Sequence, residues 1–112
     1  MLSDLIQAVI DLMASVGAPV YLADCVPADA FCPYITLAAT VPGTLTLTIW
    51  HRDHASRINM ADAITALLPM RGKHIPLDSG AAILTGGRST LLKEDSVYGL
   101  RMVWKLRLYP SA

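Results

Sequence analysis

Charged residues are scarce in this chain of 112 residues. They make up 16% of the sequence and hydrophobic residues 54%, whereas about a quarter of the residues in an ordinary soluble domain are charged. So few charges do not cover the whole surface of a folded domain. We therefore expect part of the apolar surface to be hidden by a partner or by further copies of the chain.

The chain also lacks an excess of either charge, because nine basic residues balance nine acidic ones. Tight nucleic-acid binders carry a basic excess or patch, since neutralising phosphates drives their affinity. The balance argues against sequence-specific nucleic-acid binding and against binding to a membrane surface. No apolar run approaches a membrane span, and the first residues lack the basic segment of an export signal.

Cysteine is rare as well, with only Cys25 and Cys32 present. They stand too far apart for the CxxC spacing of redox and zinc sites. We expect two reduced thiols that act as small buried hydrophobic side chains, with a disulfide or a metal site as lesser alternatives. Neither a GxSxG elbow nor a P-loop occurs. The sequence therefore predicts no catalytic residue, no cofactor, no metal and no enzymatic activity.

Two short segments invite a binding interpretation. Residues 51–54 (His-Arg-Asp-His), with His74 as a third ligand, suggest a metal site, but we favour a polar corner in which Asp53 caps a helix. Residues 85–89 (Thr-Gly-Gly-Arg-Ser) suggest a phosphate cradle. A P-loop, however, needs a Lys-Ser/Thr pair and a following helix, so a β-bulge at the two glycines is the preferred interpretation.

Apolar periodicity predicts two helices. The first spans residues 2–16 and ends at Gly17, a natural helix C-terminus. The second begins after Asp53 and runs to about residue 68, and its apolar stripe leaves Arg57 on the outside. The expected stripe consists of Met60, Ala61, Ile64, Leu67 and Leu68.

Period-two alternation predicts two hairpins. In the first, residues 34–40 and 44–51 flank a turn at Pro42-Gly43, with leucines and Ile49 inward and threonines outward. In the second, residues 81–92 and 97–109 flank a polar tip at residues 93–96.

Residues 20–22 and 73–77 are shorter extended candidates. The order of helix, strands, helix, strands is not a βαβ alternation. It predicts one α+β domain over residues 1–112, with an antiparallel or mixed sheet of four to five strands and both helices on one face. Trp104 is expected to be buried, whereas Trp50 shares a face with threonines and is a candidate interface residue.

In order and spacing, these elements resemble the small tail-completion proteins, or tail terminators, of long-tailed bacteriophages. The resemblance covers nearly the whole chain. The residues that carry it are Val20-Tyr21, Pro33-Tyr34-Ile35, the threonine-rich strand ending at Trp50, the helix with Ala61, Ile64 and Leu67-Leu68, and the final strand from Tyr98 to Tyr109.

The resemblance implies an α+β subunit that forms a ring, commonly six-fold, on the finished tail tube. Its partners would be further copies, the tail tube protein and the head or neck connector proteins. Its location would be the virion tail, after synthesis in the host cytoplasm. The alternatives are another head–tail connector component, or a small ligand-binding or regulatory domain with a defined pocket.

The hairpin around Arg88, Lys93, Glu94 and Asp95 is the expected interface, together with Trp50. This hairpin has the densest charge in the chain and adjoins the flexible glycine pair. No catalytic residues come with the family.

Overall fold

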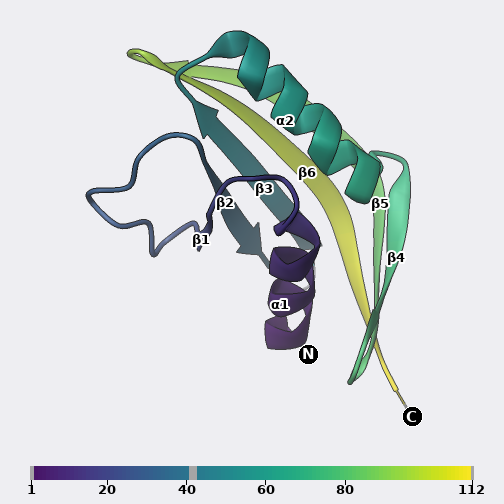
Figure 1. Cartoon of the computed structure of the whole chain (residues 1–112). Helices are drawn as coiled ribbons and strands as arrows, with labels where there is room; N and C mark the ends of the chain where they lie inside the picture. Colours follow the sequence, from purple (N-terminus) through teal and green to yellow (C-terminus); the bar gives the residue numbers. More distant parts are fainter. Residues whose placement is uncertain (1, 41–42, 112) are drawn as a thin grey trace.

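The computed structural model describes residues 2–40 and 43–111 and has one curled, mixed sheet with both helices on the same face (Figure 1). The elements in chain order are α1 (Leu2–Met13), β1 (Val20–Leu22), β2 (Tyr34–Ala39), β3 (Gly43–His51), α2 (His54–Leu67), β4 (Gly72–Leu77), β5 (Gly80–Glu94) and β6 (Val97–Pro110). The strand order is β1-β2-β3-β6-β5-β4, and only the β1–β2 pair is parallel. The α+β class is confirmed.

The predicted number of strands was wrong, because the sheet has six strands rather than four to five. Both short extended candidates pair with neighbours: β1 runs along β2, and β4 runs along β5. Each segment is too short or too irregular to show a clear alternation of apolar and polar residues. Pairing with the neighbouring strand is therefore what establishes each of them as a strand. Pro76 is tolerated because β4 lies at the sheet edge, where a missing N–H costs no ladder bond. Pro42, half of the predicted turn, lies outside the described residues.

The core lies between the sheet and the two helices. β3 alternates as expected, with Leu45, Leu47 and Ile49 fully buried. The other large side chains that are fully buried come from α1, from α2 and its C-cap residue, and from the neighbouring strands: Leu5, Met13, Ile35, Leu37, Ile64, Leu68, Leu84, Met102 and Trp104. Each buried side chain of this kind stabilises the folded protein by about 1.5–3 kcal/mol, and this burial holds both helices on the same face of the sheet.

The first helix is shorter than predicted. It ends at Met13, and the Val16 N–H donates to the Met13 carbonyl at 3.0 Å, which tightens the chain into a turn. Gly17 then takes a φ of 88°. Neither α1 nor α2, the helices of residues 2–40 and 43–111, is long and apolar enough to cross a membrane.

The glycine pair forms a β-bulge, as predicted. Thr85 pairs with Lys105 and Arg88 with Val103, so two glycines oppose the single residue Trp104. Trp104 is fully buried, and its indole N–H donates to the Pro69 carbonyl at 3.0 Å. The bulge brings both Thr85 and Arg88 to the outward face and allows the long β5–β6 hairpin to bend.

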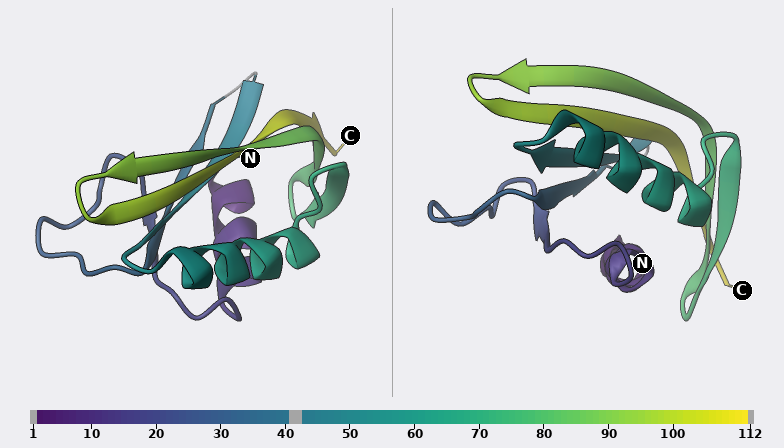
Figure 2. Two further views of the ribbon diagram at one scale, coloured as in Figure 1. Left: turned by 90° about the horizontal axis from the view of Figure 1, so that it is seen from above. Right: turned by 45° about the horizontal axis from the view of Figure 1, so that its top comes forward.

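The β5–β6 hairpin projects beyond α2 (Figure 2). It elongates the molecule, whose extents are 48 × 28 × 24 Å. Its end therefore lies outside the main core and is available for contacts.

Candidate interaction surfaces

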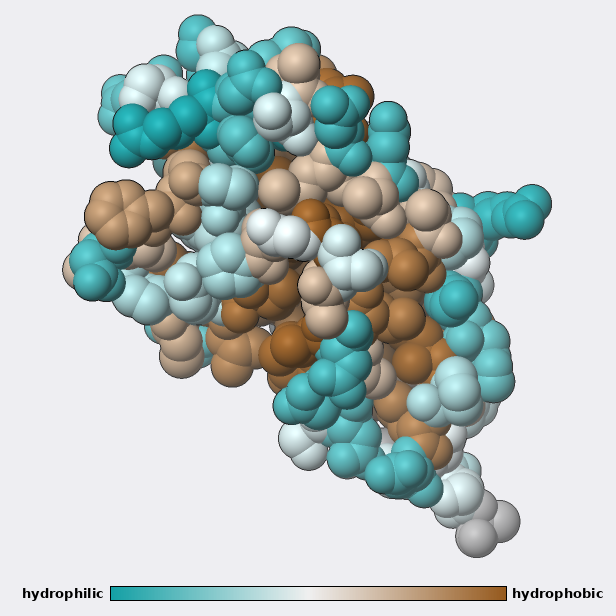
Figure 3. Space-filling model, in the orientation of Figure 1, coloured by the Kyte–Doolittle hydropathy of each residue, from teal (hydrophilic) through white to brown (hydrophobic). Residues whose placement is uncertain are grey.

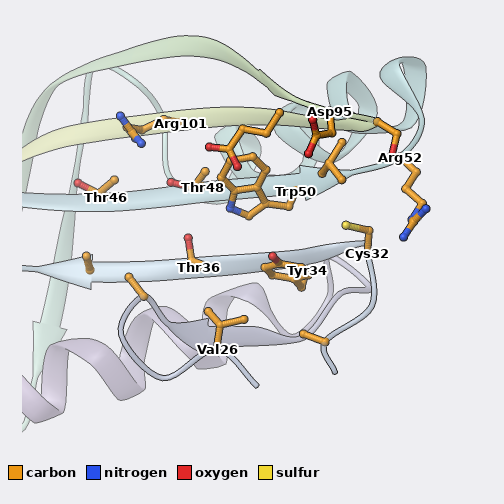
Figure 4. Close-up of a pocket in the computed structure, with 16 residues that line it drawn as sticks. Val26, Cys32, Tyr34, Thr36, Thr46, Thr48, Trp50, Arg52, Asp95 and Arg101 are labelled. Atoms are coloured by element: carbon orange, nitrogen blue, oxygen red, sulfur yellow. The ribbon is translucent and has the colours of Figure 1, made fainter. Parts of the chain in front are cut away.

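The sheet face opposite the helices, called the open face below, has a groove of about 730 Å³ (Figure 4). Its floor is formed by β2, β3 and β6, with Thr36, Thr46 and Thr48 pointing into it. The loop of residues 23–33 borders one side and the hairpin tip of residues 93–96 the other. A polar face of this kind is expected when an antiparallel sheet is covered on one side only.

Trp50 lies in this groove and is half-buried. Its register partner on β6 is Gly99, and a Cβ added at Gly99 would lie 2.8 Å from the indole Cζ3. The missing side chain of Gly99 therefore lets the indole lie flat across the sheet. The structure places Trp50 on an accessible surface, where the sequence put it.

Tyr34 pairs with Trp50 from the β2 side, and its ring meets that of Tyr21 edge-on at 5.9 Å. Burial raises the pKa of Tyr34, and the neighbouring Cys32 and Glu94 raise it further. Glu94 belongs to the opposite wall of the groove.

The loop of residues 23–33 is more exposed than predicted. Phe31, the only phenylalanine of the chain, is a large apolar side chain and is nevertheless 82% exposed. Cys25 is exposed and Cys32 half-buried, and both are free thiols, so the expectation of two buried cysteines was wrong. The Cys25 thiol donates to the Asp24 carboxylate at 3.5 Å, and this bond and the carboxylate charge raise the pKa of Cys25. The loop has too few apolar neighbours to bury them.

Arg57 was predicted to lie outside the buried stripe of α2, but it is only 3% exposed. Its Nη1 donates to the carbonyls of Leu92 at 3.2 Å and Gly99 at 2.9 Å, and its Nη2 contacts His54 Nδ1. Its guanidinium lies 5.3 Å from the centre of the Tyr98 ring. Arg57 thus ties α2 to the projecting hairpin.

The spacing of α2 contained a signal for this role. Arg57 stands four residues before Ala61 and seven before Ile64, which places all three on one helix face. The charge of Arg57 nevertheless favours a position facing solvent. The sequence of the helix does not reveal the carbonyl acceptors on β5 and β6 that satisfy this charge in the core.

The four charged residues expected at the hairpin do not form one patch. Lys93, Glu94 and Asp95 stand at the tip, where Asp95 takes a φ of 50°. Lys93 faces the helix side, 5.6 Å from the Tyr98 ring centre. Glu94 and Arg88 face the open side, but Arg88 lies back at the bulge, six residues away along β5. At about 3.3 Å a residue, some 20 Å separate them.

The segment of residues 51–54 forms the polar corner that the sequence predicted. The Asp53 carboxylate accepts from the Ser56 N–H at 2.8 Å and the Ser56 hydroxyl at 2.6 Å, and these bonds lower its pKa. His51 Nδ1 accepts the Asp53 N–H at 3.0 Å. Within residues 2–40 and 43–111, no three His, Cys, Asp or Glu side chains are grouped to hold a metal ion.

The helix side also exposes apolar atoms. Figure 3 shows hydrophobic surface between α1 and β4, where a cavity of about 470 Å³ is lined by apolar residues of both elements (Ala8, Leu12, Ile75 and Pro76) and, in part, by Asp11, Lys73 and His74. On the hairpin, Leu91 is 60% exposed. The folded chain thus exposes apolar surface, as its low content of charged residues leads one to expect.

Charge is divided between the two halves of the chain, a feature that the overall balance conceals. Residues 1–51 contain no lysine or arginine and four aspartates, a formal charge of −4. Residues 52–112 contain all nine basic residues and the other five acidic ones, which gives 9 − 5 = +4. A count by segment would have found this signal.

No protein-family model matches this chain, and no curated protein is similar enough to count as a relative.

Proposed function

We propose that this chain is a non-enzymatic structural subunit that assembles with copies of itself into a ring, caps a phage or prophage tail tube and joins it to the head or neck. The observation that carries the proposal is the pair of projecting segments, the loop of residues 23–33 and the β5–β6 hairpin. They expose large apolar side chains, with Phe31 at 82% and Leu91 at 60%. Side chains of this size are usually covered by a partner.

Ring assembly also fits the division of charge along the chain. A ring requires a heterologous contact, in which one patch meets a different patch on the next copy. The acidic first half and the basic second half supply two unlike surfaces in one subunit. Another head–tail connector component would have the same properties and is the nearest alternative.

The groove on the open face favours a second candidate, a small ligand-binding or regulatory domain. Its volume of about 730 Å³ lies within the range of about 300–1,000 Å³ typical of ligand sites. Ligand sites, however, are mainly apolar, whereas threonines and the charged side chains of Arg52, Glu94 and Arg101 line this groove. The assembly proposal therefore has the stronger support.

The decisive experiment is deletion of the coding sequence in the source phage or prophage, followed by induction and negative-stain electron microscopy. We expect overlong tails, or tails separate from filled heads, and rescue by the wild-type gene supplied in trans. Tail-less heads that have lost their DNA would instead identify a connector. Normal infectious particles would contradict the proposal.

The charged residues of the hairpin, at its tip and at the bulge, and Trp50 are the proposed contact residues. Reversing Arg88, Lys93, Glu94 and Asp95 together should abolish ring formation while circular dichroism and the thermal midpoint stay unchanged. Ring formation by this variant would remove the hairpin from the interface. A Trp50→Ala variant tests the groove in the same assay.

A further inference from the structure

Four cations lie on the open face of β5 and β6: Arg88, Arg101, Lys105 and Arg107. All four are exposed, and together they are called the basic patch. Lys105 and Arg107 are two residues apart and so share a face at about 7 Å. Like charges this close repel each other unless anions cover them.

None of the register partners of the patch residues is acidic. The register partners of Arg101 are Thr48 and Thr90, and those of Lys105 are Thr44 and Thr85. Arg88 lies opposite Val103, and Arg107 lies opposite Ile83. The acidic residue on the open face of β5 is Glu94, at the tip of the hairpin, where it lines the groove together with Arg101 but not with the other three cations.

The matching surface is the loop of residues 23–33. Asp24 and Asp29 are exposed, and the loop belongs to the half of the chain without lysine or arginine. Phe31, 82% exposed, stands two residues after Asp29 and offers a large apolar side chain. Two exposed carboxylates in the same loop as an exposed aromatic side chain form a good anchor for a basic, partly apolar surface.

We propose that the acidic loop of one copy docks on the basic patch of the next copy. This inference rests on the proposed function and assigns the two unlike surfaces of its heterologous contact. The occupant is a second copy because the loop and the patch have complementary charge within one sequence. Within one copy the loop borders the groove that Arg101 lines. Arg88, Lys105 and Arg107 lie on β5 and β6, beyond β3 from β1 and β2, and do not line that groove, which leaves them to the loop of the next copy.

The test reverses each surface separately. The patch variant is Arg101→Glu with Lys105→Glu, and the loop variant is Asp24→Lys with Asp29→Lys. Each variant alone presents like charges at the contact, so sedimentation velocity at low salt should show association weakened by roughly a hundredfold or more. An equimolar mixture of the two, and one chain carrying all four changes, should associate again.

Matched controls reverse exposed charges elsewhere. Asp62→Lys on α2 and Arg71→Glu before β4 make similar charge changes and should leave association as in the wild type. Circular dichroism on every variant separates lost association from lost folding.

Three results would overturn the inference. The first is a single-surface variant that associates like the wild type, and the second is a mixture that associates no better than its components. The third is a patch variant that associates normally but loses affinity for a duplex DNA fragment, which would assign the patch to nucleic acid. In each case the deletion phenotype still decides the proposed function, so the two failures remain distinguishable.

Discussion

The two positions of the bulge require glycine for different physical reasons. A Cβ at Gly87 would lie 2.6 Å from the Met70 carbonyl oxygen and 2.8 Å from the Trp104 indole nitrogen. At Gly86 the nearest atom, on Lys105, is 4.0 Å away, but the φ of 58° disfavours a side chain. Gly87 is therefore needed to avoid a collision with the backbone, whereas Gly86 is needed for its left-handed conformation.

These reasons predict unequal costs. Gly87→Ala should lower the free energy of unfolding by about 3 kcal/mol, because fixed backbone atoms must move. Gly86→Ala should cost only about 1 kcal/mol, the strain of a left-handed residue. Urea unfolding of both variants measures the difference, and equal losses would contradict this account of the bulge.

The second residue pair is Gly99 and Trp50. Gly99→Ala should cost about 1–2 kcal/mol and shift the indole fluorescence, because the new methyl group displaces the ring. In a Trp50→Leu background the same change should cost much less. A double-mutant cycle measures this coupling, and additive losses would show that the indole does not rest on Gly99.

Among the elements, α2 and the β5–β6 hairpin depend on Arg57. Arg57→Met keeps most of the apolar stem but removes the donors to Leu92 and Gly99. We expect a loss of about 2 kcal/mol in the free energy of unfolding, because both carbonyls lose a charged donor. Hydrogen exchange should accelerate in residues 88–102 before the core of β3.

Arg57→Lys is the matched control for this element. Lysine keeps the charge but has one nitrogen on a shorter side chain, so it cannot reproduce both the Nη1 bonds to the two carbonyls and the Nη2 contact with His54, and its effect should be intermediate. Uniformly faster exchange throughout the sheet would show that Arg57 acts on the whole core and not on the hairpin.

The start of α2 gives a pH prediction. Hydrogen bonds from Ser56 lower the pKa of Asp53, so its stabilising effect is complete above the ordinary aspartate pKa of about 3.9 and is lost as pH falls through the lower folded value. Asp53→Asn keeps a capping oxygen that does not titrate. The urea midpoint of the wild type should therefore exceed that of the variant at pH 7 and approach it near pH 2. A pH-independent difference would contradict this.

For the whole molecule, the division of charge predicts a salt effect. If the acidic loop meets the basic patch, association of the wild-type chain should weaken steeply with added salt, because the Debye length falls from ~30 Å at 0.01 M to ~3 Å at 1 M. Sedimentation velocity across this range measures it. The variant with both surfaces reversed should show the same slope. Association that strengthens with salt would point instead to an apolar contact through Phe31 or Leu91.

Several features of this molecule follow from local sequence patterns alone. The alternation of β3, the cap at Asp53 and the bulge at Gly86-Gly87 depend on backbone geometry within a few residues, so local patterns predict them. For the same reason, two helices and two long hairpins could be placed with approximate ends.

The tertiary structure alone decided the rest. The burial of Arg57 depends on carbonyls 35 and 42 residues away, and the strand identity of β1 and β4 depends on their partners. Alternation along the last strand already places Arg101, Lys105 and Arg107 on one face, but the addition of Arg88 to that face follows from the bulge and from strand register. Such contacts join residues far apart in the chain, and periodicity reports only which face a residue takes, not what lies opposite it.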